Sequence, residues 1–502
     1  MPGSLTAFVP PVVLVCACAV AQEFSHAGDA APSPAFVARE KKLVGFSWAM
    51  PSPSQLREHM RDLKQAAPYL DGLVFKLPEA PAGQWPPWLP AFDERAWTEA
   101  DVQLDALREI RWGRFRHNFI SLGPGPTYDD LRVSWFDDAA WETVQANLRL
   151  LSRAVAVSRA RGVFFDTENY SGAWHYWSVQ GLRANPPLKV CLYPGFTFPQ
   201  VEAKVRQRGR EFIGALQSEK PDLVLMATFL LHSSGDAPEK VETSDFPLLR
   251  AFTEGMLEAA GPQVRLVDGT ESTYWTNASD GYLYGYNALR ESGLRILPAE
   301  LHPRRLQLCS SGMAVFYDAL LTGLYTDKLP VDREYRLKWL EHNLYHGLLT
   351  NDEWTWLYFE KADPWTGEGV PPEAAAALER GKAKALGSQP LGWTMVWQSL
   401  SGPVPSKVFD TPTFRITKPA PDASPRASEN LVVELAAADG VPLTSVQLYL
   451  DSRPSAKLLA PPFRATLTNV PPGTHTLRAV GYFTGDADRG ECAPVVFDVT
   501  PW

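Results

Sequence analysis

Short apolar runs alternate with longer amphipathic stretches along most of the chain, from residue 42 to about residue 360. Most of the runs are rich in Val, Leu and Phe, as strands buried on both faces of a parallel sheet are. Their alternation with helical patterns is typical of βα units. Eight strands are predicted, over residues 43–48, 72–76, 118–122, 162–166, 223–228, 264–268, 306–310 and 354–359.

The stretches between these runs repeat apolar residues every three to four positions, which predicts helices. Eight βα repeats over about 350 residues fit an α/β fold of the (β/α)8 barrel type. An open, doubly wound sheet is the structural alternative. No glycine-rich phosphate-binding sequence follows the first strand, which disfavours the nucleotide-binding form of that sheet. Helices are predicted over residues 54–66, 141–161, 200–219, 246–260, 332–348 and 372–386.

The pattern changes after Thr413, where strand signals become short and turn residues separate them. This is typical of an all-β sandwich. We therefore predict a barrel over residues 41–400, a proline-bearing linker over 401–412 and a sandwich over 413–502. The predicted sandwich strands are 414–417, 431–437, 445–451, 464–470, 474–484 and 495–500.

Three phrases in this last region carry a resemblance: Ile-Thr-Lys-Pro at 416–419, Ser-Val-Gln-Leu-Tyr-Leu-Asp at 445–451 and Pro-Gly-Thr-His-Thr-Leu-Arg-Ala at 472–479. They resemble the bacterial immunoglobulin-like modules that are appended to secreted enzymes. The resemblance implies that the sandwich is a spacer or accessory domain and that chemistry belongs to the barrel.

The first 21 residues are predicted to be a signal peptide. Residues 7–20 are almost wholly apolar, and Ala19-Val20-Ala21 forms a small-x-small cleavage site. Residues 22–40 are predicted to be a disordered leader. Export makes the protein secreted or periplasmic, with lipoprotein anchoring through Cys16 or Cys18 as the alternative. No integral membrane segment is predicted in the mature chain, because no other stretch is apolar enough.

The amino-acid composition narrows the classes of molecule that the protein is expected to bind. The net charge of −9 argues against nucleic acid, because phosphate binding needs a basic face. Seventeen tryptophans suit either stacking on sugar rings or packing in a large barrel. The mature chain keeps Cys191, Cys309 and Cys492, an odd number without a CxxC spacing. No metal and no cofactor is predicted, and a bond between Cys191 and Cys309 stays an open alternative.

Carboxylates follow three of the predicted strands. The fourth strand ends in Asp166-Thr167-Glu168, the sixth ends in Asp268 with Glu271 three residues on, and the eighth is followed by Glu360. In a (β/α)8 barrel the carboxyl ends of all strands meet at one mouth.

Asp166 and Glu168 are two residues apart, so both face the same side of a strand. Glycosidic cleavage needs one carboxyl group that holds a proton and one that is ionised. We therefore predict Asp166 or Glu168 as nucleophile or base, and Asp268 or Glu271 as acid. A structural role in an ion pair is the alternative for each, and retention or inversion of configuration stays open.

Aromatic and polar residues near the same strand ends are candidates for substrate binding, because rings stack on sugar faces while polar groups bind hydroxyls. The alternative for the rings is a small hydrophobic core under long loops. The predicted binding residues are Trp48, Lys76, Asn118, Tyr170, Trp174, Trp177, Tyr274, Trp275 and Glu360.

The sequence Phe-Phe-Asp-Thr-Glu-Asn-Tyr at 164–170 and the eightfold pattern resemble the (β/α)8 glycoside hydrolases. The chain departs from one large clan, which has Asn-Glu at this place, and lacks the Asp-x-x-Asp-x-Asp-x-Glu of the chitinase-like families. The resemblance implies a secreted glycoside hydrolase that acts on a poly- or oligosaccharide, with cell-surface polysaccharide among the candidate partners.

Three alternatives compete with this interpretation. A noncatalytic carbohydrate-binding or surface-adhesion protein would need the aromatic residues but not the carboxylates. A metallohydrolase barrel would need a His-x-His that the chain lacks, and His342 and His346, four apart, are predicted on the outer face of a helix. A serine hydrolase would need Gly-x-Ser-x-Gly, which is also absent.

Overall fold

The computed structural model describes residues 40–77, 89–124, 133–168, 176–184, 187–231, 237–276, 278–322, 324, 333–387, 389–396, 407–409, 413–421, 423–483 and 488–501. The predicted signal peptide and all but the last residue of the predicted leader lie outside these residues. Val37–Trp502 form one compact unit.

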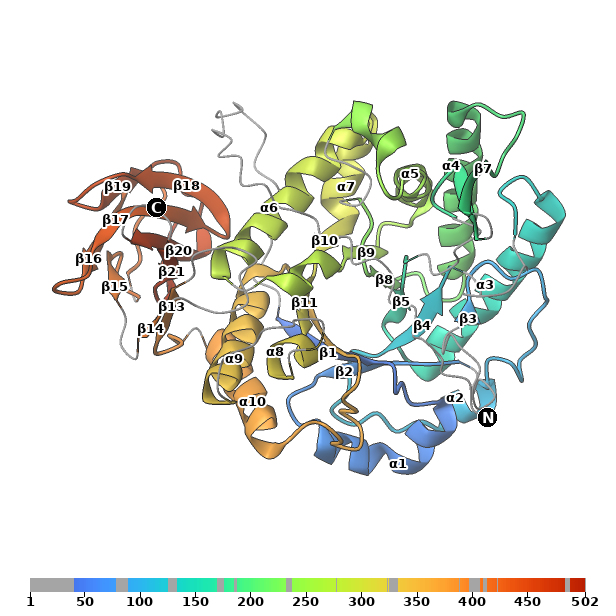
Figure 1. Cartoon of the computed structure of the whole chain (residues 1–502), viewed down its shortest axis with the longest axis horizontal. Coiled ribbons are helices and arrows are strands. Elements are labelled where there is room, and N and C mark those ends of the chain that lie inside the picture. The colour runs from blue at the N-terminus through green and yellow to red at the C-terminus, as the bar shows by residue number, and fades with distance from the viewer. Residues whose placement is uncertain are drawn as a thin grey trace. The chain divides into compact units, whose positions relative to one another are not determined.

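Nine parallel strands form the central sheet of this unit (Figure 1). In the order of the sheet they are β10 (Cys309–Ser311), β9 (Arg265–Asp268), β8 (Val224–Ala227), β5 (Gly162–Phe165), β4 (Phe119–Gly123), β2 (Gly72–Phe75), β1 (Lys42–Ser47), β12 (Trp354–Phe359) and β11 (Met313–Phe316).

The two ends of this strand path are joined, because Gly312 alone separates β10 from β11. Since β10 pairs with β9 and β11 pairs with β12, residues 309–316 act as one interrupted strand, the seventh stave, that closes the barrel. Counted this way the barrel has eight strand positions, or staves, and the predicted (β/α)8 fold is confirmed. A two-residue strand, β3 (Leu89–Pro90), pairs with β4 outside the ring.

The seventh strand was predicted to begin three residues too early, so only Cys309 and Ser310 of the predicted run lie in β10. Residues 306–308 end helix α7 (His302–Leu308), and the strand begins at Cys309. The other seven predicted strands overlap β1, β2, β4, β5, β8, β9 and β12.

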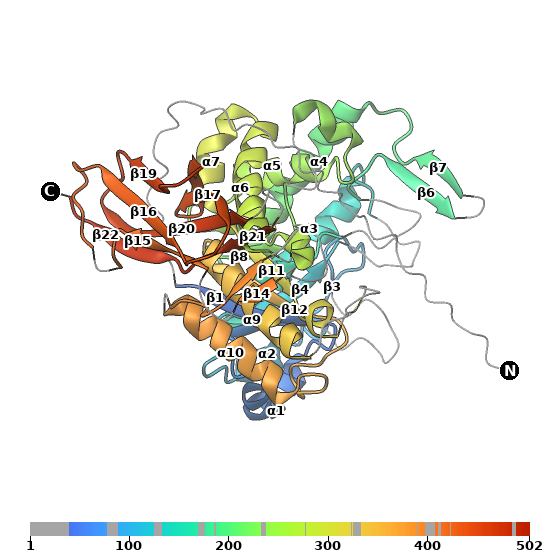
Figure 2. The same ribbon diagram turned by 60° about the vertical axis from the view of Figure 1, so that its left-hand side comes forward.

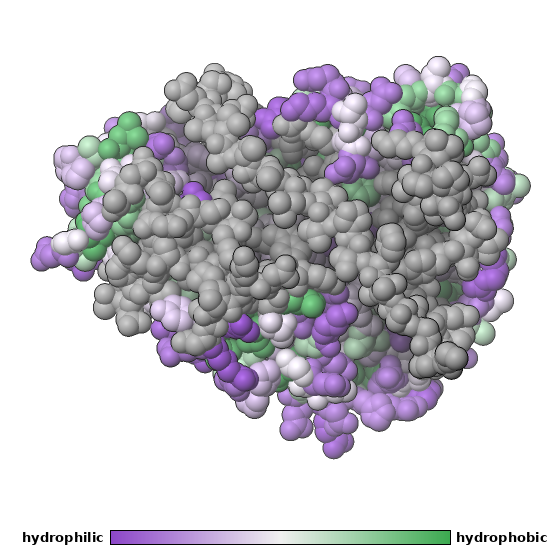
Figure 3. All heavy atoms as spheres, in the orientation of Figure 1, coloured by the Kyte–Doolittle hydropathy of each residue, from purple (hydrophilic) through white to green (hydrophobic). Residues whose placement is uncertain are grey.

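Helices cover the outside of the sheet (Figure 1). Helix α1 shows why they form: Ser52 caps its first turn in a capping box with Gln55, and Leu56, Met60 and Leu63 are buried toward the sheet. The surface over α1, at the lower edge of Figure 3, is mostly hydrophilic. The helices are α1 (Pro53–Ala66), α2 (Leu104–Glu109), α3 (Asp138–Ser158), α4 (Phe198–Leu216), α5 (Leu249–Ala259), α6 (Ser279–Ile296), α7, α8 (Tyr317–Leu321), α9 (Arg333–Thr350) and α10 (Pro372–Leu386).

The interior of the barrel is filled by large side chains, most of them aromatic. Phe46 stacks on Phe164 with ring centroids 4.7 Å apart, and the edge of Trp356 meets the Phe164 ring at 5.1 Å. β5 and β8 can lie close together because β5 begins with Gly162, where a Cβ atom would lie 1.8 Å from the Val224 carbonyl oxygen of β8. The barrel is therefore a packed core and not a pore, and only its mouth is open to a substrate.

The C-terminal region folds as an antiparallel sandwich with its own core, which includes Val433, Val446, Leu448 and Leu477 (Figure 2). This confirms the predicted immunoglobulin-like architecture. One sheet contains β15 (Phe414–Lys418), β16 (Leu431–Ala437) and β19 (Arg464–Leu467). The other contains β17 (Leu443–Leu450), β18 (Arg453–Leu458), β20 (Gly473–Phe483), β21 (Asp488–Glu491) and β22 (Val495–Val499).

Part of the predicted linker is a strand. Lys407–Phe409 form β14, which pairs antiparallel with β13 (Thr394–Val396). A second hairpin, β6 (Gln180–Ala184) with β7 (Pro187–Cys191), comes after β5 along the chain.

The sandwich packs against helices of the barrel through buried polar groups. The Arg478 side chain on β20 is fully buried and pairs with Glu491, at 2.6 Å from Nε to Oε1. Its Nη1 donates to Thr350 Oγ1 of α9 at 2.7 Å. A second contact joins Arg489 to Asp280 of α6 at 3.1 Å. Arg478 is thus neutralised within the sandwich and hydrogen-bonded to α9, while Arg489 and Asp280 pair opposite charges across the contact.

Candidate active site

Four of the carboxylates predicted for the site follow the carboxyl ends of barrel strands. Asp166 and Glu168 follow β5, Glu271 opens the short 3-10 helix η3 (Glu271–Trp275) after β9, and Glu360 follows β12. Asp166 is 2% exposed, whereas Glu168, Glu271 and Glu360 are half-buried. The parallel strands aim all four at one mouth of the barrel.

Glu271 is the carboxyl group whose protonation the mouth perturbs most clearly. Its pKa is raised well above the usual range of a glutamate, first by burial and then by the negative charges of Glu168 and Asp166. The three groups are therefore close enough to interact electrostatically. Such an arrangement favours the protonated form of Glu271, which is the form that a general acid needs.

Two tyrosines lie beside this group. The rings of Tyr274 and Tyr358 stack with centroids 5.1 Å apart and an interplanar angle of 9°. Burial and the nearby carboxylates, Glu271 and Glu168 among them, raise the pKa of both phenols, so both stay protonated. The Tyr358 hydroxyl donates to Glu360 Oε2 at 3.4 Å.

Trp48 adds a half-buried ring at the mouth. Its ring centroid is 6.4 Å from that of Tyr358, in an edge-on arrangement. Together with Tyr274 and Tyr358, each 7% exposed, it forms an aromatic cluster next to the carboxylates. Flat rings beside hydrogen-bonding groups suit a sugar, which has apolar faces and polar edges.

The segment that carries Asp166 and Glu168 is held from two sides. The Thr167 backbone N–H donates to Thr228 Oγ1 at 3.0 Å, and the two threonine hydroxyls lie 2.9 Å apart. The Trp177 Nε1–H donates to the Thr167 carbonyl at 2.7 Å. Asp166 Oδ1 accepts the Glu168 backbone N–H at 3.0 Å.

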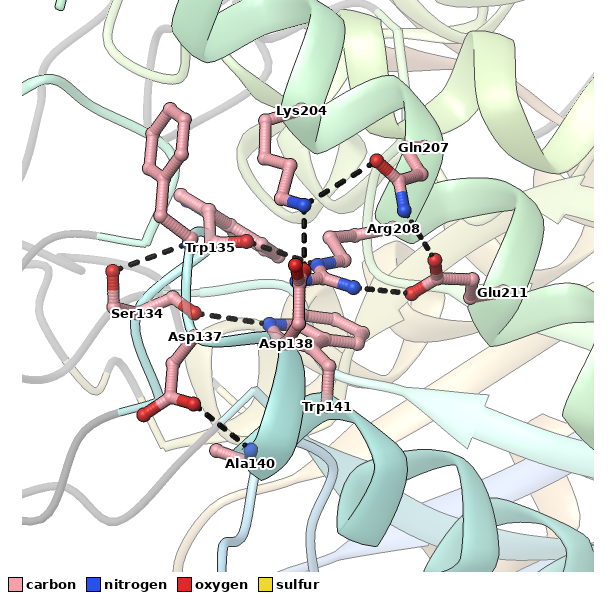
Figure 4. A network of polar contacts seen from close by, with 11 residues as sticks. Ser134, Trp135, Asp137, Asp138, Ala140, Trp141, Lys204, Gln207, Arg208 and Glu211 are labelled. Atoms are coloured by element: carbon pink, nitrogen blue, oxygen red, sulfur yellow. Dashed lines mark hydrogen bonds and ion pairs between the residues drawn. The ribbon is translucent and has the colours of Figure 1, made fainter.

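Trp177 belongs to a tryptophan-rich cluster behind this segment. Its ring centroid is 5.9 Å from that of Trp135, whose Nε1–H donates to the Tyr176 carbonyl at 3.0 Å. The Trp135 carbonyl in turn accepts from Nε of the buried Arg208 on α4 at 2.9 Å (Figure 4). Arg208 lies over the Trp141 ring and pairs with Asp138 at the start of α3 and with Glu211. The cluster ties the loop before α3 to the segment after β5.

Asp268 has a different environment from the other predicted catalytic residues. Its Oδ2 accepts the backbone N–H groups of Leu230 and Leu231, both at 3.1 Å. Its Oδ1 accepts the Thr270 N–H at 3.4 Å. The Asp268 side chain thus fixes the backbone after β8. Glu271, three residues further on, is the carboxyl group that interacts electrostatically with Glu168 and Asp166.

The predicted binding residues separate into two groups. Trp48, Tyr274 and Glu360 lie at the mouth, and Glu360 also pairs with Lys361 at 3.6 Å. Lys76 follows β2 and is half-buried.

Two other predicted binding residues have no exposed side chain. Asn118 precedes β4, at the opposite end of the barrel, where its fully buried side chain bonds Leu73 N and the Phe115 carbonyl. Trp177 is fully buried. Trp275 lies in η3, and its side chain, like Tyr170 and Trp174, lies outside the described residues.

Sequence reasoning missed Asp318, which is 1% exposed on α8 just after β11. Its carboxylate accepts the backbone N–H groups of Glu360, Lys361 and Ala362, at 2.7, 3.2 and 3.3 Å. Asp318 therefore holds the Glu360 segment. The signal was its place two residues beyond the true end of the seventh stave, which the misplaced strand prediction concealed.

No cluster of metal-binding side chains occurs among the described residues. The predicted outer position of His342 and His346 is wrong. Both rings are buried where α9 meets the sandwich, with centroids 4.4 Å apart, and burial lowers the pKa of both. Cys191, Cys309 and Cys492 are free thiols, so the alternative of a bond between Cys191 and Cys309 is not realised.

The comparisons with known proteins identify the C-terminal module. Residues 412–479 match the family described as Bacterial Ig domain. No curated protein matches the chain. Within the described part of the chain, no helix combines the length and the apolar character needed to cross a membrane.

Several solved structures are similar to the chain at low identity. A Bacteroides uniformis β-glucuronidase is 12% identical with a TM-score of 0.34, over 92% of this chain and 46% of that one. A modular endo-β-1,4-mannanase from Cellulomonas fimi is 12% identical with a TM-score of 0.35, over 92% and 94% of the two chains. A GH5-4 broad specificity endoglucanase from an uncultured bacterium is 12% identical with a TM-score of 0.37, over 69% and 97%.

Proposed function

We propose that this protein is a glycoside hydrolase that cleaves a poly- or oligosaccharide, with Glu271 as the general acid and Glu168 as the base or nucleophile. The observation that carries the proposal is the raised pKa of Glu271 beside Glu168 and Asp166. A carboxyl group whose pKa is raised is suited to protonate the departing glycosidic oxygen, while a second carboxylate acts on the sugar or on water.

The other groups at the mouth fit binding roles in this reaction. The half-buried Trp48 offers a ring to a sugar, and the buried, stacked rings of Tyr274 and Tyr358 lie beside it. Glu360, which accepts from the Tyr358 hydroxyl, can accept a hydrogen bond from a sugar hydroxyl. Asp166, whose Oδ1 accepts the Glu168 backbone N–H, helps to hold the Glu168 segment in place.

We also propose that the protein acts outside the cytoplasm. The predicted signal peptide over residues 1–21 supports export. The bacterial Ig-like module supports it as well, because such modules accompany secreted enzymes in the resemblance described above.

The test starts with the purified protein on a panel of polysaccharides and aryl glycosides. On any substrate that is cleaved, Glu271→Gln and Glu168→Gln are each expected to lower kcat by about 10²–10⁴-fold while the protein stays folded. Glu291→Gln is the matched control, because Glu291 lies on α6 with 45% of its side chain exposed. Full activity in either active-site variant would refute the assignment.

The leaving group separates the two roles. An aryl glycoside with an acidic phenol needs no protonation, so Glu271→Gln should retain far more activity on it than on a polysaccharide, whereas Glu168→Gln should be impaired on both. If the wild-type protein binds glycans and cleaves none, the alternative of a carbohydrate-binding or adhesion protein replaces this proposal. For any substrate that is cleaved, the configuration of the first product, measured by NMR, distinguishes retention from inversion.

A further inference from the structure

Thr228 occupies the position between the two proposed catalytic residues. It directly follows β8, the strand that separates β5, which leads to Glu168, from β9, which leads to Glu271. Thr228 is 2% exposed. It therefore touches the segments on both sides without facing the solvent.

Each polar group of Thr228 is bonded to one of these segments. Its N–H donates to the Phe165 carbonyl at 3.1 Å, and its carbonyl accepts the Glu271 N–H at 3.1 Å. Its Oγ1 accepts the Thr167 N–H at 3.0 Å and lies 2.9 Å from Thr167 Oγ1. One residue thus bonds the backbone of Glu271 and the residue next to Glu168.

We propose that Thr228 is a positioning residue whose hydroxyl fixes the Glu168 segment relative to Glu271. This inference rests on the proposed function, because it assigns a role in the same reaction. The hydroxyl is the specific element: the two backbone bonds of Thr228 form with any side chain, but only Oγ1 reaches Thr167 N.

Loss of the hydroxyl should displace Glu168. The Thr167 N–H would lose its acceptor in a buried site, and a buried donor without a partner moves to find one. Glu168 is the next residue, so any rearrangement of Thr167 moves its carboxylate. A misplacement of about 1 Å in an active site costs about 10²-fold in rate.

Three variants separate positioning from general stability. Thr228→Val keeps the β-branched shape and removes the hydroxyl, whereas Thr228→Ser keeps the hydroxyl and removes the methyl group. Thr253→Val is the control, because Thr253 is equally buried but its Oγ1 bonds only Leu249 O of its own helix α5. If Thr228→Val does not fold, Thr228→Ala replaces it.

The first measurement is steady-state kinetics on a substrate of the wild-type protein. Thr228→Val should lower kcat by about 10- to 100-fold with KM within about twofold. Thr228→Ser and Thr253→Val should stay within about threefold of the wild type. Wild-type kcat in Thr228→Val, or in Thr228→Ala where that variant replaces it, would overturn the proposal.

The second measurement needs no activity. In protein labelled with ¹³C at the glutamate carboxyl groups, the titration of Glu271 is assigned by its absence in Glu271→Gln. Thr228→Val should shift the pKa of Glu271 toward the usual glutamate range, because Glu168 no longer lies in place beside it. Thr228→Ser and Thr253→Val should leave it unchanged.

The two readouts distinguish the possible failures. A protein without activity on any glycoside would refute the proposed function, while the titration would still test the role of Thr228. An unchanged Glu271 titration together with an unchanged kcat would overturn the positioning role alone.

Discussion

The buried Arg478 allows a prediction about how the sandwich is attached. Its side chain has no exposed surface, and it makes two bonds to Glu491, from Nε at 2.6 Å and from Nη2 at 3.0 Å. A further bond reaches Thr350 Oγ1 at 2.7 Å. Arg478→Met keeps the length of the side chain but leaves the Glu491 carboxylate, 1% exposed, without its counter-charge.

The expected loss follows from this burial. Removal of one partner of a buried ion pair typically costs about 3–5 kcal/mol, because the remaining charge stays desolvated. We expect a decrease of this size in the free energy of unfolding, measured by urea titration followed by tryptophan fluorescence. Replacement of both charges by apolar residues, Arg478→Met with Glu491→Leu, should recover most of the loss.

A surface pair in the same sandwich is the control. Lys418 and Glu434 lie 3.1 Å apart, but 59% of the lysine side chain is exposed. Lys418→Met should therefore change stability by less than about 1 kcal/mol. A loss of less than about 1 kcal/mol in Arg478→Met would refute the reasoning. So would a double variant, Arg478→Met with Glu491→Leu, that is less stable than Arg478→Met alone. Calorimetry should show one transition in the wild type if the contact couples the two regions.

Three further predictions concern pH and single carboxylates. The basic limb of the pH–activity profile should lie above the ordinary glutamate range, because activity is lost as Glu271 gives up its proton, and Asp166→Asn should move this limb to lower pH; a limb that does not move contradicts the electrostatic argument. Asp268→Asn should lower the free energy of unfolding by about 1–3 kcal/mol, because an amide oxygen replaces two carboxylate oxygens that accept three backbone N–H groups, and urea titration against Glu291→Gln checks it. Burial lowers the pKa of His342 from 6.5 to about 4, so the unfolded chain takes up a proton in this interval that the folded protein does not, and this group should lower stability by about 3 kcal/mol as the pH falls from 6.5 to 4. In a comparison of unfolding curves, His342→Gln should reduce the slope but not abolish it, because the pKa of His346 is lowered as well.

Much of the barrel could be predicted from the sequence, because strands buried on both faces are continuous apolar runs. β1, β5 and β12 are examples. The seventh stave escaped this logic, because Ser310 and Ser311 are polar although they are buried in β10, while the preceding apolar residues lie in α7. Strand pattern alone does not reveal buried serines.

The site could be predicted only in part. The rule that chemistry lies at strand ends selected Glu168 and Glu271, the residues of the proposed site. It did not separate Glu271 from Asp268, because the difference depends on backbone donors at Leu230 and Leu231, which are distant in sequence. For the same reason Trp177 could not be identified as a core residue before its contact with Thr167 was known.

The anchoring of the sandwich bears on how such a chain can change by recombination. A module attached only by its linker can be exchanged without consequence for its neighbour. Here α9 carries Thr350 and His346, whose side chains are bonded by Arg478 of the module. A replacement module would have to fit this contact, with an arginine and its glutamate or with apolar residues of similar volume at the same place. We therefore expect the barrel and this module to be inherited together as one unit.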